Sequence, residues 1–275
     1  MIALVHMHKT AGTTLATILK RSFGIQHCTV YCWQKGKPFF SASDYRRLAR
    51  LYPRLESISG HDIKPYSDLE TVRPDILYYT FLRNPLDRTA SQYQYEVQMG
   101  GGKRSFEEWI ERPENRDYQV DKLTTEKTAA AAIATLESKG MFVGVMERFD
   151  ESIVMFQRRV GPDRLRDIRY HRKLVAPNNE IKKRLLTDPA TRAMLEEANR
   201  EDLALWEHVM SDLYPRQQRE YGAGLEEAVA AFRERNARMS RLNSTLTPRY
   251  VTYSAKWWGL YIPLLQMVRA AGGRR

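Results

Sequence analysis

The chain has 275 residues and a formal net charge of +11 at neutral pH, from 44 lysines and arginines against 33 acidic residues. This length suits one large domain or a domain with an appendage, and the basic excess favours anionic partners such as nucleotides, acidic sugars, acidic lipid surfaces or nucleic acid. The two cysteines, Cys28 and Cys32, are too few for a disulfide framework and lack the other ligands of a zinc site, so we expect packed thiols.

The chain opens with a predicted strand, a tight loop and the start of a helix. Residues 2–7 are apolar with β-branched members, as in a buried strand, and apolar spacing up to Phe23 predicts a helix capped by Thr13 or Thr14. The loop between them contains Lys9 and further hydroxyl donors. Because the first N–H groups of a helix are unpaired and its dipole is positive there, this segment predicts an anion site.

Strands and helices alternate along the next part of the chain. Strands are predicted over residues 57–60, 75–82 and 141–146, and helices over 41–52, 85–99, 125–139, 151–160 and 188–213, the last ended by Tyr214 and Pro215. Alternation of this kind implies right-handed crossovers and a parallel sheet. We therefore expect an α/β fold, with a P-loop NTPase-like parallel β-sheet flanked by helices, and a long basic loop over residues 164–179.

The last part of the chain changes character and predicts a mostly helical C-terminal extension. We expect an α/β domain over residues 1–215 and the extension over residues 216–275. Within the extension, the apolar stretch 257–268, which begins at Trp257, is too short to span a bilayer. Capping of the core, contact between two copies in a homodimer, and peripheral contact with a membrane surface beside the C-terminal arginines stay open. The opening residues show no signal or anchor pattern, which predicts either a cytoplasmic protein, membrane-associated if this stretch lies on a bilayer, or a trimmed form of a longer chain.

A second predicted anion site follows the strand 75–82. Arg83 lies at the carboxyl end of that strand, where ligands bind in open α/β sheets, and its guanidinium suits a phosphate. Pro85 occupies the favoured first position of the next helix, and Ser91 lies two turns into it. Arg88 is expected to brace the site or to pair with an acid.

These two segments resemble the nucleotide-binding elements of sulfotransferases that use 3′-phosphoadenylyl sulfate (PAPS), in particular the heparan sulfate 2-O-sulfotransferase type. The opening loop resembles H-x-x-K-T-A-G-T-[TS] at His6 and at six consecutive positions, departing at His8, where the family often has proline. The segment from Arg83 resembles R-[ND]-P-x-x-R-x-x-S-x-Y. The resemblance implies that the 3′-phosphate is held by Arg83 and Ser91, and that the 5′-phosphosulfate is held by Lys9, Thr10, Ala11, Gly12, Thr13 and Thr14.

Two downstream segments extend the resemblance to about residue 214. Residues 142–149 are similar to the F-x-G-x-x-E-x-[FL] strand of the family, and residues 170–173 to the basic loop that closes over the nucleotide. The second similarity implies that Arg172 and Lys173 contact the cofactor, while a solvated basic loop is equally open.

His61 is the leading candidate for the catalytic base. It follows the predicted strand 57–60, whose carboxyl end should open on the same sheet edge as the loop, and histidine titrates near neutral pH. Its Gly-His is similar to the Gly-His that carries the catalytic histidine of the family, whereas the other family histidine is Ser59 here. Glu56 and His6 are weaker candidates, and Asp62 is expected to point away.

The residues and the resemblance together predict a PAPS-dependent O-sulfotransferase, with adenosine 3′,5′-bisphosphate (PAP) as product. The acceptor is expected to be a hydroxyl of a saccharide or glycoconjugate such as a glycolipid, and Lys9 to stabilise the leaving group. No metal is expected, because the lysine precedes the glycine, unlike in G-x-x-x-x-G-K-[ST], and Asp150 is separated from the strand 141–146. The alternatives are a P-loop kinase using ATP and magnesium, or an inactive nucleotide-binding protein of the same fold. Dispersed basic residues disfavour a nucleic-acid partner.

Overall fold

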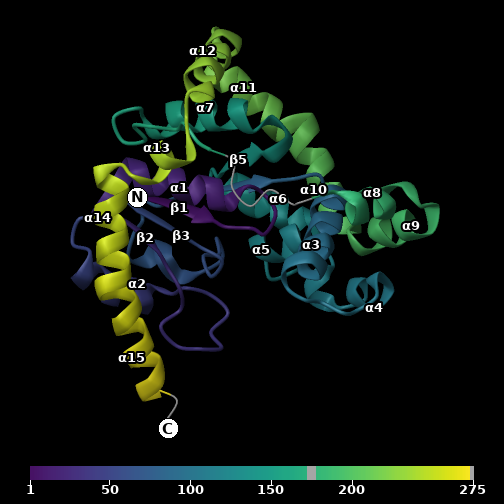
Figure 1. Ribbon diagram of the computed structural model, residues 1–275, viewed down its shortest axis with the longest axis horizontal. Coiled ribbons are helices and arrows are strands. Elements are labelled where there is room, and N and C mark those ends of the chain that lie inside the picture. The colour runs from purple at the N-terminus through teal and green to yellow at the C-terminus, as the bar shows by residue number, and fades with distance from the viewer. Residues whose placement is uncertain (172–177, 273–275) are drawn as a thin grey trace.

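The computed structural model describes residues 1–171 and 178–272, built around a sheet of five parallel strands (Figure 1). The strands lie in the order β2-β3-β1-β4-β5. Their bounds are β1 Ile2–Val5, β2 His27–Thr29, β3 Ser57–Gly60, β4 Leu77–Leu82 and β5 Phe142–Val145. Every pairing is parallel, which confirms the predicted α/β class. Strand β2 was not predicted, because three residues at a sheet edge are too few to show a period.

Helices connect the strands and form most of the rest. Their bounds are α1 Gly12–Phe23, α2 Ala42–Leu51, α3 Pro85–Met99, α4 Phe106–Ile110, α5 Tyr118–Leu123, α6 Ala129–Ser138, α7 Phe149–Val160, α8 Glu180–Thr187, α9 Pro189–Ala198, α10 Arg200–His208, α11 Tyr214–Tyr221, α12 Leu225–Ala237, α13 Arg241–Thr245, α14 Pro248–Lys256 and α15 Ile262–Gly272. Short 3₁₀ turns lie at η1 Gly24–Gln26, η2 Asp68–Thr71, η3 Pro113–Asn115 and η4 Met146–Arg148, and wider π turns at η5 Val209–Leu213 and η6 Trp257–Tyr261.

The expected helix end at Tyr214 and Pro215 was wrong. The chain continues from η5 into α11, with Pro215 in the first turn. A proline is tolerated there because its missing N–H group would have no partner in the first turn. The predicted boundary at residue 215 therefore falls within α11.

The sheet is buried on both faces, as predicted for its apolar strands. The four residues of β1 are at most 1% exposed, and Cys28 and Cys32 are buried free thiols. A second, smaller apolar cluster joins α3, α4, α8 and α9, which lie together on the side of the molecule away from α14 and α15 (Figure 1).

The C-terminal helices lie along the sheet edge that β2 forms (Figure 1). Trp257 donates its indole N–H to the Thr29 carbonyl oxygen at 2.8 Å, and the Tyr261 hydroxyl accepts the Tyr31 backbone N–H at 3.0 Å. Tyr261 also belongs to the main core cluster. Side chains of this tail thus satisfy backbone groups on the outer side of the edge.

This packing is what core capping requires, and contact with a second copy or with a membrane stays a prediction. In residues 1–171 and 178–272, no helix is both long and apolar enough to cross a bilayer.

Candidate active site

The predicted site residues follow three strands that are neighbours in the sheet. His61 follows β3, the loop from His6 to Ala11 follows β1, and Arg83 follows β4. Because β3, β1 and β4 are adjacent and parallel, their carboxyl ends meet at one edge. The sheet order therefore assembles at one edge three segments that are dispersed in the sequence.

The loop after β1 presents a run of backbone N–H groups. Lys9 and Ala11 have φ angles of 65° and 63°, in the left-handed region that non-glycine residues rarely adopt. The amide groups of residues 9–13 donate no hydrogen bond to any group in the described part of the chain. Unpaired donors at the N-terminus of a helix form a ready anion site.

The threonines of this loop differ in their surroundings. Thr10 is buried and donates its hydroxyl to the Met7 carbonyl at 3.2 Å, which braces the loop. Thr13 is exposed and Thr14 is buried. The expected cap at Thr13 or Thr14 was wrong, because left-handed Ala11 turns the chain into α1 earlier. Contact of the hydroxyl groups with a ligand stays a prediction.

Gly12 is required by a close approach to His6. A β-carbon at residue 12 would lie 1.9 Å from the imidazole ring of His6, which is far inside contact distance. The glycine therefore lets the loop close over the histidine that follows β1.

Arg83 joins the second anion site to the first. Its guanidinium Nη1 donates to the Lys9 carbonyl oxygen at 3.2 Å. Gln119 holds the backbone of Arg83 from both sides, accepting its N–H at 3.0 Å and donating to its carbonyl at 2.9 Å. Asp87 lies 3.7 Å from the guanidinium and also pairs with Lys182.

Two cations thus lie close together in this site. Burial lowers the pKa of Lys9, and the nearby charge of Arg83 lowers it further. Burial is also the main cause of the lowered pKa of Arg83, against the opposing effect of Asp87. The Lys9 ammonium lies 4.4 Å from the centroid of the Tyr95 ring. An anion bound between the two cations would relieve this repulsion.

The other two polar residues of the segment after β4 have separate surroundings. Arg88 is 1% exposed, donates to the Thr89 hydroxyl at 2.8 Å and lies 4.5 Å from the Tyr118 ring centroid, as expected of a bracing residue. Ser91 is half-buried, and its hydroxyl makes no hydrogen bond within residues 1–171 and 178–272. Its predicted contact with a phosphate stays a prediction.

His61 is held in an orientation that suits a base. Its Nδ1 lies 2.9 Å from the His6 carbonyl oxygen. A carbonyl only accepts hydrogen bonds, so Nδ1 carries the proton and Nε2 keeps a free lone pair. The ring is stacked between His6 and His8, with both pairs of centroids 4.1 Å apart. Burial lowers the pKa of His61, so the ring is neutral at pH 7.

The weaker base candidates face other partners. Glu56 precedes β3, at the opposite edge of the sheet, and accepts a hydrogen bond from Arg164 at 2.8 Å. Asp62 accepts the Cys32 backbone N–H at 2.9 Å, as expected of a carboxylate that points away. The hydroxyl of Ser59 lies 3.2 Å from His27 Nε2, inside the fold.

His6 packs beneath His61, and burial, followed by the charge of His61, lowers its pKa to about 3. Sequence reasoning missed His8 as a stacking partner and Gln119 as the residue that orients Arg83. The His8 departure from the family pattern was visible, but no local pattern marked Gln119.

Arg172 and Lys173 lie outside the described residues. The Asp150 carboxylate accepts hydrogen bonds from Tyr170 at 2.8 Å and from Arg233 at 3.0 Å. Both of its oxygens are thus engaged by protein groups, and the expected independence from metal stays a prediction.

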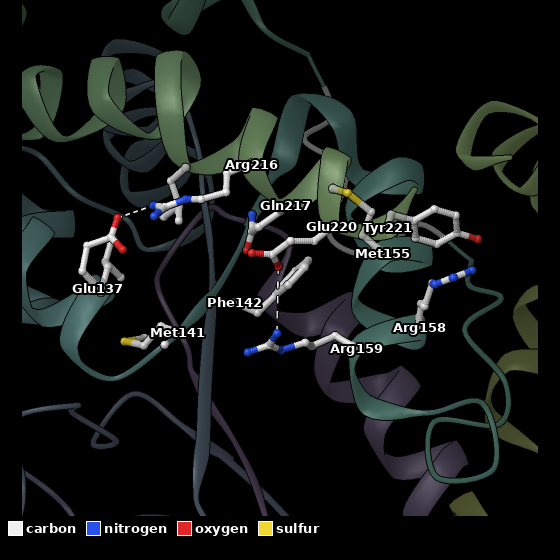
Figure 2. A pocket seen from close by; sticks show the side chains of 13 residues that line it. Glu137, Met141, Phe142, Met155, Arg158, Arg159, Arg216, Gln217, Glu220 and Tyr221 are labelled. Carbon is white, nitrogen blue, oxygen red and sulfur yellow. Dashed lines mark hydrogen bonds and ion pairs between the residues drawn. The ribbon is translucent and has the colours of Figure 1, made fainter. Parts of the chain in front are cut away.

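A cavity of about 380 Å³ lies at the opposite edge of the sheet, where β5 begins (Figure 2). Three arginines line it, but each has a partner. Arg216 pairs with Glu137, Arg159 lies 3.9 Å from Glu220, and Arg158 lies 4.7 Å from the Tyr221 ring centroid. The cavity is therefore largely neutralised and distinct from the strand-end site.

The comparisons with known proteins give only a weak similarity of fold. No family model matches the chain, and no curated protein matches it. Among solved structures, a sulfotransferase from Alicyclobacillus acidocaldarius is similar, with a TM-score of 0.38 and 17% sequence identity. The match covers 74% of this chain and 98% of that one. Similarity at this level says nothing about activity, so function has to come from the residues of this chain.

Proposed function

We propose that this protein is a sulfotransferase that transfers the sulfuryl group of PAPS to a hydroxyl of a saccharide or glycoconjugate. One contact supports the proposal most, the 3.2 Å hydrogen bond from the Arg83 guanidinium to the Lys9 carbonyl, and the charge of Arg83 also lowers the pKa of Lys9. A ligand with anionic groups on both the 3′ and 5′ positions of one ribose suits such a pair. The sequence patterns around Lys9 and Arg83 support the same ligand.

Each part of the donor has candidate residues. Lys9 and the unpaired amide groups of residues 9–13 would hold the 5′-phosphosulfate. Arg83, oriented by Gln119, would hold the 3′-phosphate, together with Ser91. The donor supplies an electrophilic sulfur and a bisphosphate leaving group.

His61 and Lys9 divide the chemistry of an in-line displacement. His61 takes the hydroxyl proton at Nε2 as the acceptor oxygen forms its bond to sulfur. When the bond between the 5′-phosphate oxygen and sulfur breaks, the oxygen keeps the electron pair. Lys9 and the loop amides stabilise the negative charge that results. Since all these groups come from fixed strand ends, catalysis would rest on alignment and charge neutralisation. A cytoplasmic location and independence from metal are part of the same proposal.

Thermal unfolding with two nucleotides tests the proposal. PAP at about 100 times its dissociation constant should stabilise the protein by about 2.7 kcal/mol without metal, and ATP with magnesium should have little effect. The reverse result would favour a P-loop kinase. Stabilisation by PAP with no sulfate transfer to any of a panel of sugars and glycolipids would favour an inactive nucleotide-binding protein.

A further inference from the structure

A second pair of basic residues lies near His61 and has no role in the proposed transfer. Lys64, three positions after His61, is only 4% exposed, and Lys122 reaches it from α5. Their ammonium groups lie 5.9 Å from the Tyr66 ring centroid and 4.9 Å from the Tyr118 ring centroid, respectively. Burial, followed by the charge of Lys122 and a hydrogen bond with it, lowers the pKa of Lys64 to about 7.

The nearby carboxylates are engaged with other groups. Asp62 accepts the Cys32 backbone N–H, and Asp121 lies 3.7 Å from Lys127. Within the described residues, neither Lys64 nor Lys122 forms an ion pair with a carboxylate. The charges of Asp121 and Asp62 offset only part of the burial cost and of the repulsion that lower the pKa of Lys64, and a bound anion would offset more of both.

A chain of rings connects this pair to the candidate base. The Tyr118 ring lies 5.8 Å from His8, and His8 is stacked on His61. Both lysines also lower the pKa of His61 through their charges, so they lie within its electrostatic range. An acceptor hydroxyl at His61 would therefore lie within the range of the same two charges.

We propose that Lys64 and Lys122 form an acceptor-side oxyanion subsite, which binds a carboxylate, sulfate or phosphate group of the acceptor and positions its hydroxyl at His61. The role of this subsite in binding the acceptor rests on the proposed sulfotransferase function, whereas its ability to bind an anion depends on the lysine pair alone. Two ammonium groups provide charge-assisted hydrogen bonds to such an oxyanion. Its binding favours the protonated form of Lys64, so the protein takes up a proton when the subsite fills.

Calorimetric titration of inorganic sulfate tests the subsite, using protein saturated with PAP so that the Lys9 and Arg83 site is filled. Measurements at about pH 7.5, in two buffers of different ionisation enthalpy, should show sulfate binding with net proton uptake. Sodium glucuronate and inorganic phosphate in parallel titrations show which oxyanion is preferred. Lys64→Met, which keeps a chain of similar shape, should weaken binding at least tenfold and abolish the uptake. Lys122→Met should weaken binding to a similar extent.

Lys139→Met is the matched control, because Lys139 already pairs with Glu70 and should not affect the titration. No sulfate binding to the PAP-saturated protein, or unchanged binding by Lys64→Met, would overturn the subsite. Weaker PAP binding by Lys64→Met would assign the pair to the nucleotide and overturn its acceptor role. Failure of PAP itself to bind would instead reject the sulfotransferase proposal. In that case the sulfate titration would use the Lys9→Ala protein without PAP. Adding Lys64→Met to this protein should weaken sulfate binding to the same extent.

Discussion

The two edges of the sheet carry similar basic side chains in different electrostatic settings. At the edge where the strands begin, Arg159 and Arg216 have glutamate partners around the cavity of Figure 2. At the edge where the strands end, the Arg83 guanidinium contacts the Lys9 carbonyl and its charge lowers the pKa of Lys9. A run of unpaired amide groups lies beside them. The charges of Asp87 and Glu147 act on Arg83, but Asp87 is shared with Lys182 and Glu147 accepts the Asn84 backbone N–H.

This difference shows why a net charge does not locate a site. An arginine that already has a carboxylate partner gains little from a further anion, because the partner must be displaced or repelled. Cations held together without full compensation gain much more. A cavity is therefore a weaker guide to function than the pairing of the charges that line it.

Replacement of His61 is the change with the largest expected effect. His61→Ala should reduce turnover by about 10²- to 10⁴-fold, the usual contribution of a general base, because His61 is the histidine whose Nδ1 is fixed by the His6 carbonyl so that Nε2 is left to accept a proton. Affinity for PAP should change little. Steady-state transfer of labelled sulfate, with calorimetric titration of PAP, measures both. Retained turnover would move the base to another residue.

A matched pair of arginine variants tests the comparison of the two edges. Arg83→Ala should weaken PAP binding by about 10- to 100-fold, the value of a hydrogen-bonded charge of about 1.5–3 kcal/mol. Arg159→Ala, which removes an exposed arginine paired with Glu220, should leave PAP binding unchanged. Equal losses in the two variants would contradict a localised site and indicate a general effect of charge.

The close packing of the loop gives a smaller expected effect. Gly12→Ala places a β-carbon against the His6 ring and should lower the free energy of unfolding by about 1–3 kcal/mol, the usual range for overpacking. Gly259→Ala is a suitable control, since its β-carbon would meet nothing within 4 Å. Urea unfolding of both variants measures the difference. A Gly12→Ala protein as stable as the control would show that the loop can readily move away from His6.

The histidines beneath the loop predict a gradual loss of stability in acid. The pKa of His6 is about 3 in the folded protein and near 6.5 when unfolded, so only the unfolded chain takes up this proton between those values. The contribution of His6 to stability is therefore complete above pH 6.5 and falls as the pH drops toward 3. His6→Gln should make the fall of the unfolding free energy shallower, by at most about 1.4 kcal/mol per pH unit. An unchanged slope would show that other groups cause the acid sensitivity.

The sequence could predict that the candidate residues lie at one edge of the sheet, because each of them follows a strand closely. Strand, loop and helix signals are local, and in a parallel sheet the carboxyl ends of neighbouring strands meet. The positions of Lys9, His61 and Arg83 after their strands were therefore enough to predict that they share one edge. The same local rules failed at Pro215, where a proline that was expected to end a helix lies in the first turn of the next one.

Contacts between distant residues could not be predicted in this way. Gln119 holds Arg83 across 36 positions, and no pattern around α5 indicates it. Lys64 is buried and interacts with Lys122, 58 positions further along the chain, although lysine alone predicts an exposed side chain. Strand β2 becomes visible only through its ladder with β3.

The covering of β2 by the C-terminal helices has a consequence for biosynthesis. Trp257, which donates a hydrogen bond to the Thr29 carbonyl, lies 228 positions further along the chain. At ribosomal rates of about 5–20 residues per second, roughly 11 to 46 s pass between the synthesis of strand β2 and the synthesis of Trp257. During that interval its outward backbone groups are open to pairing with other nascent chains, so we expect chaperone binding at this edge until translation ends.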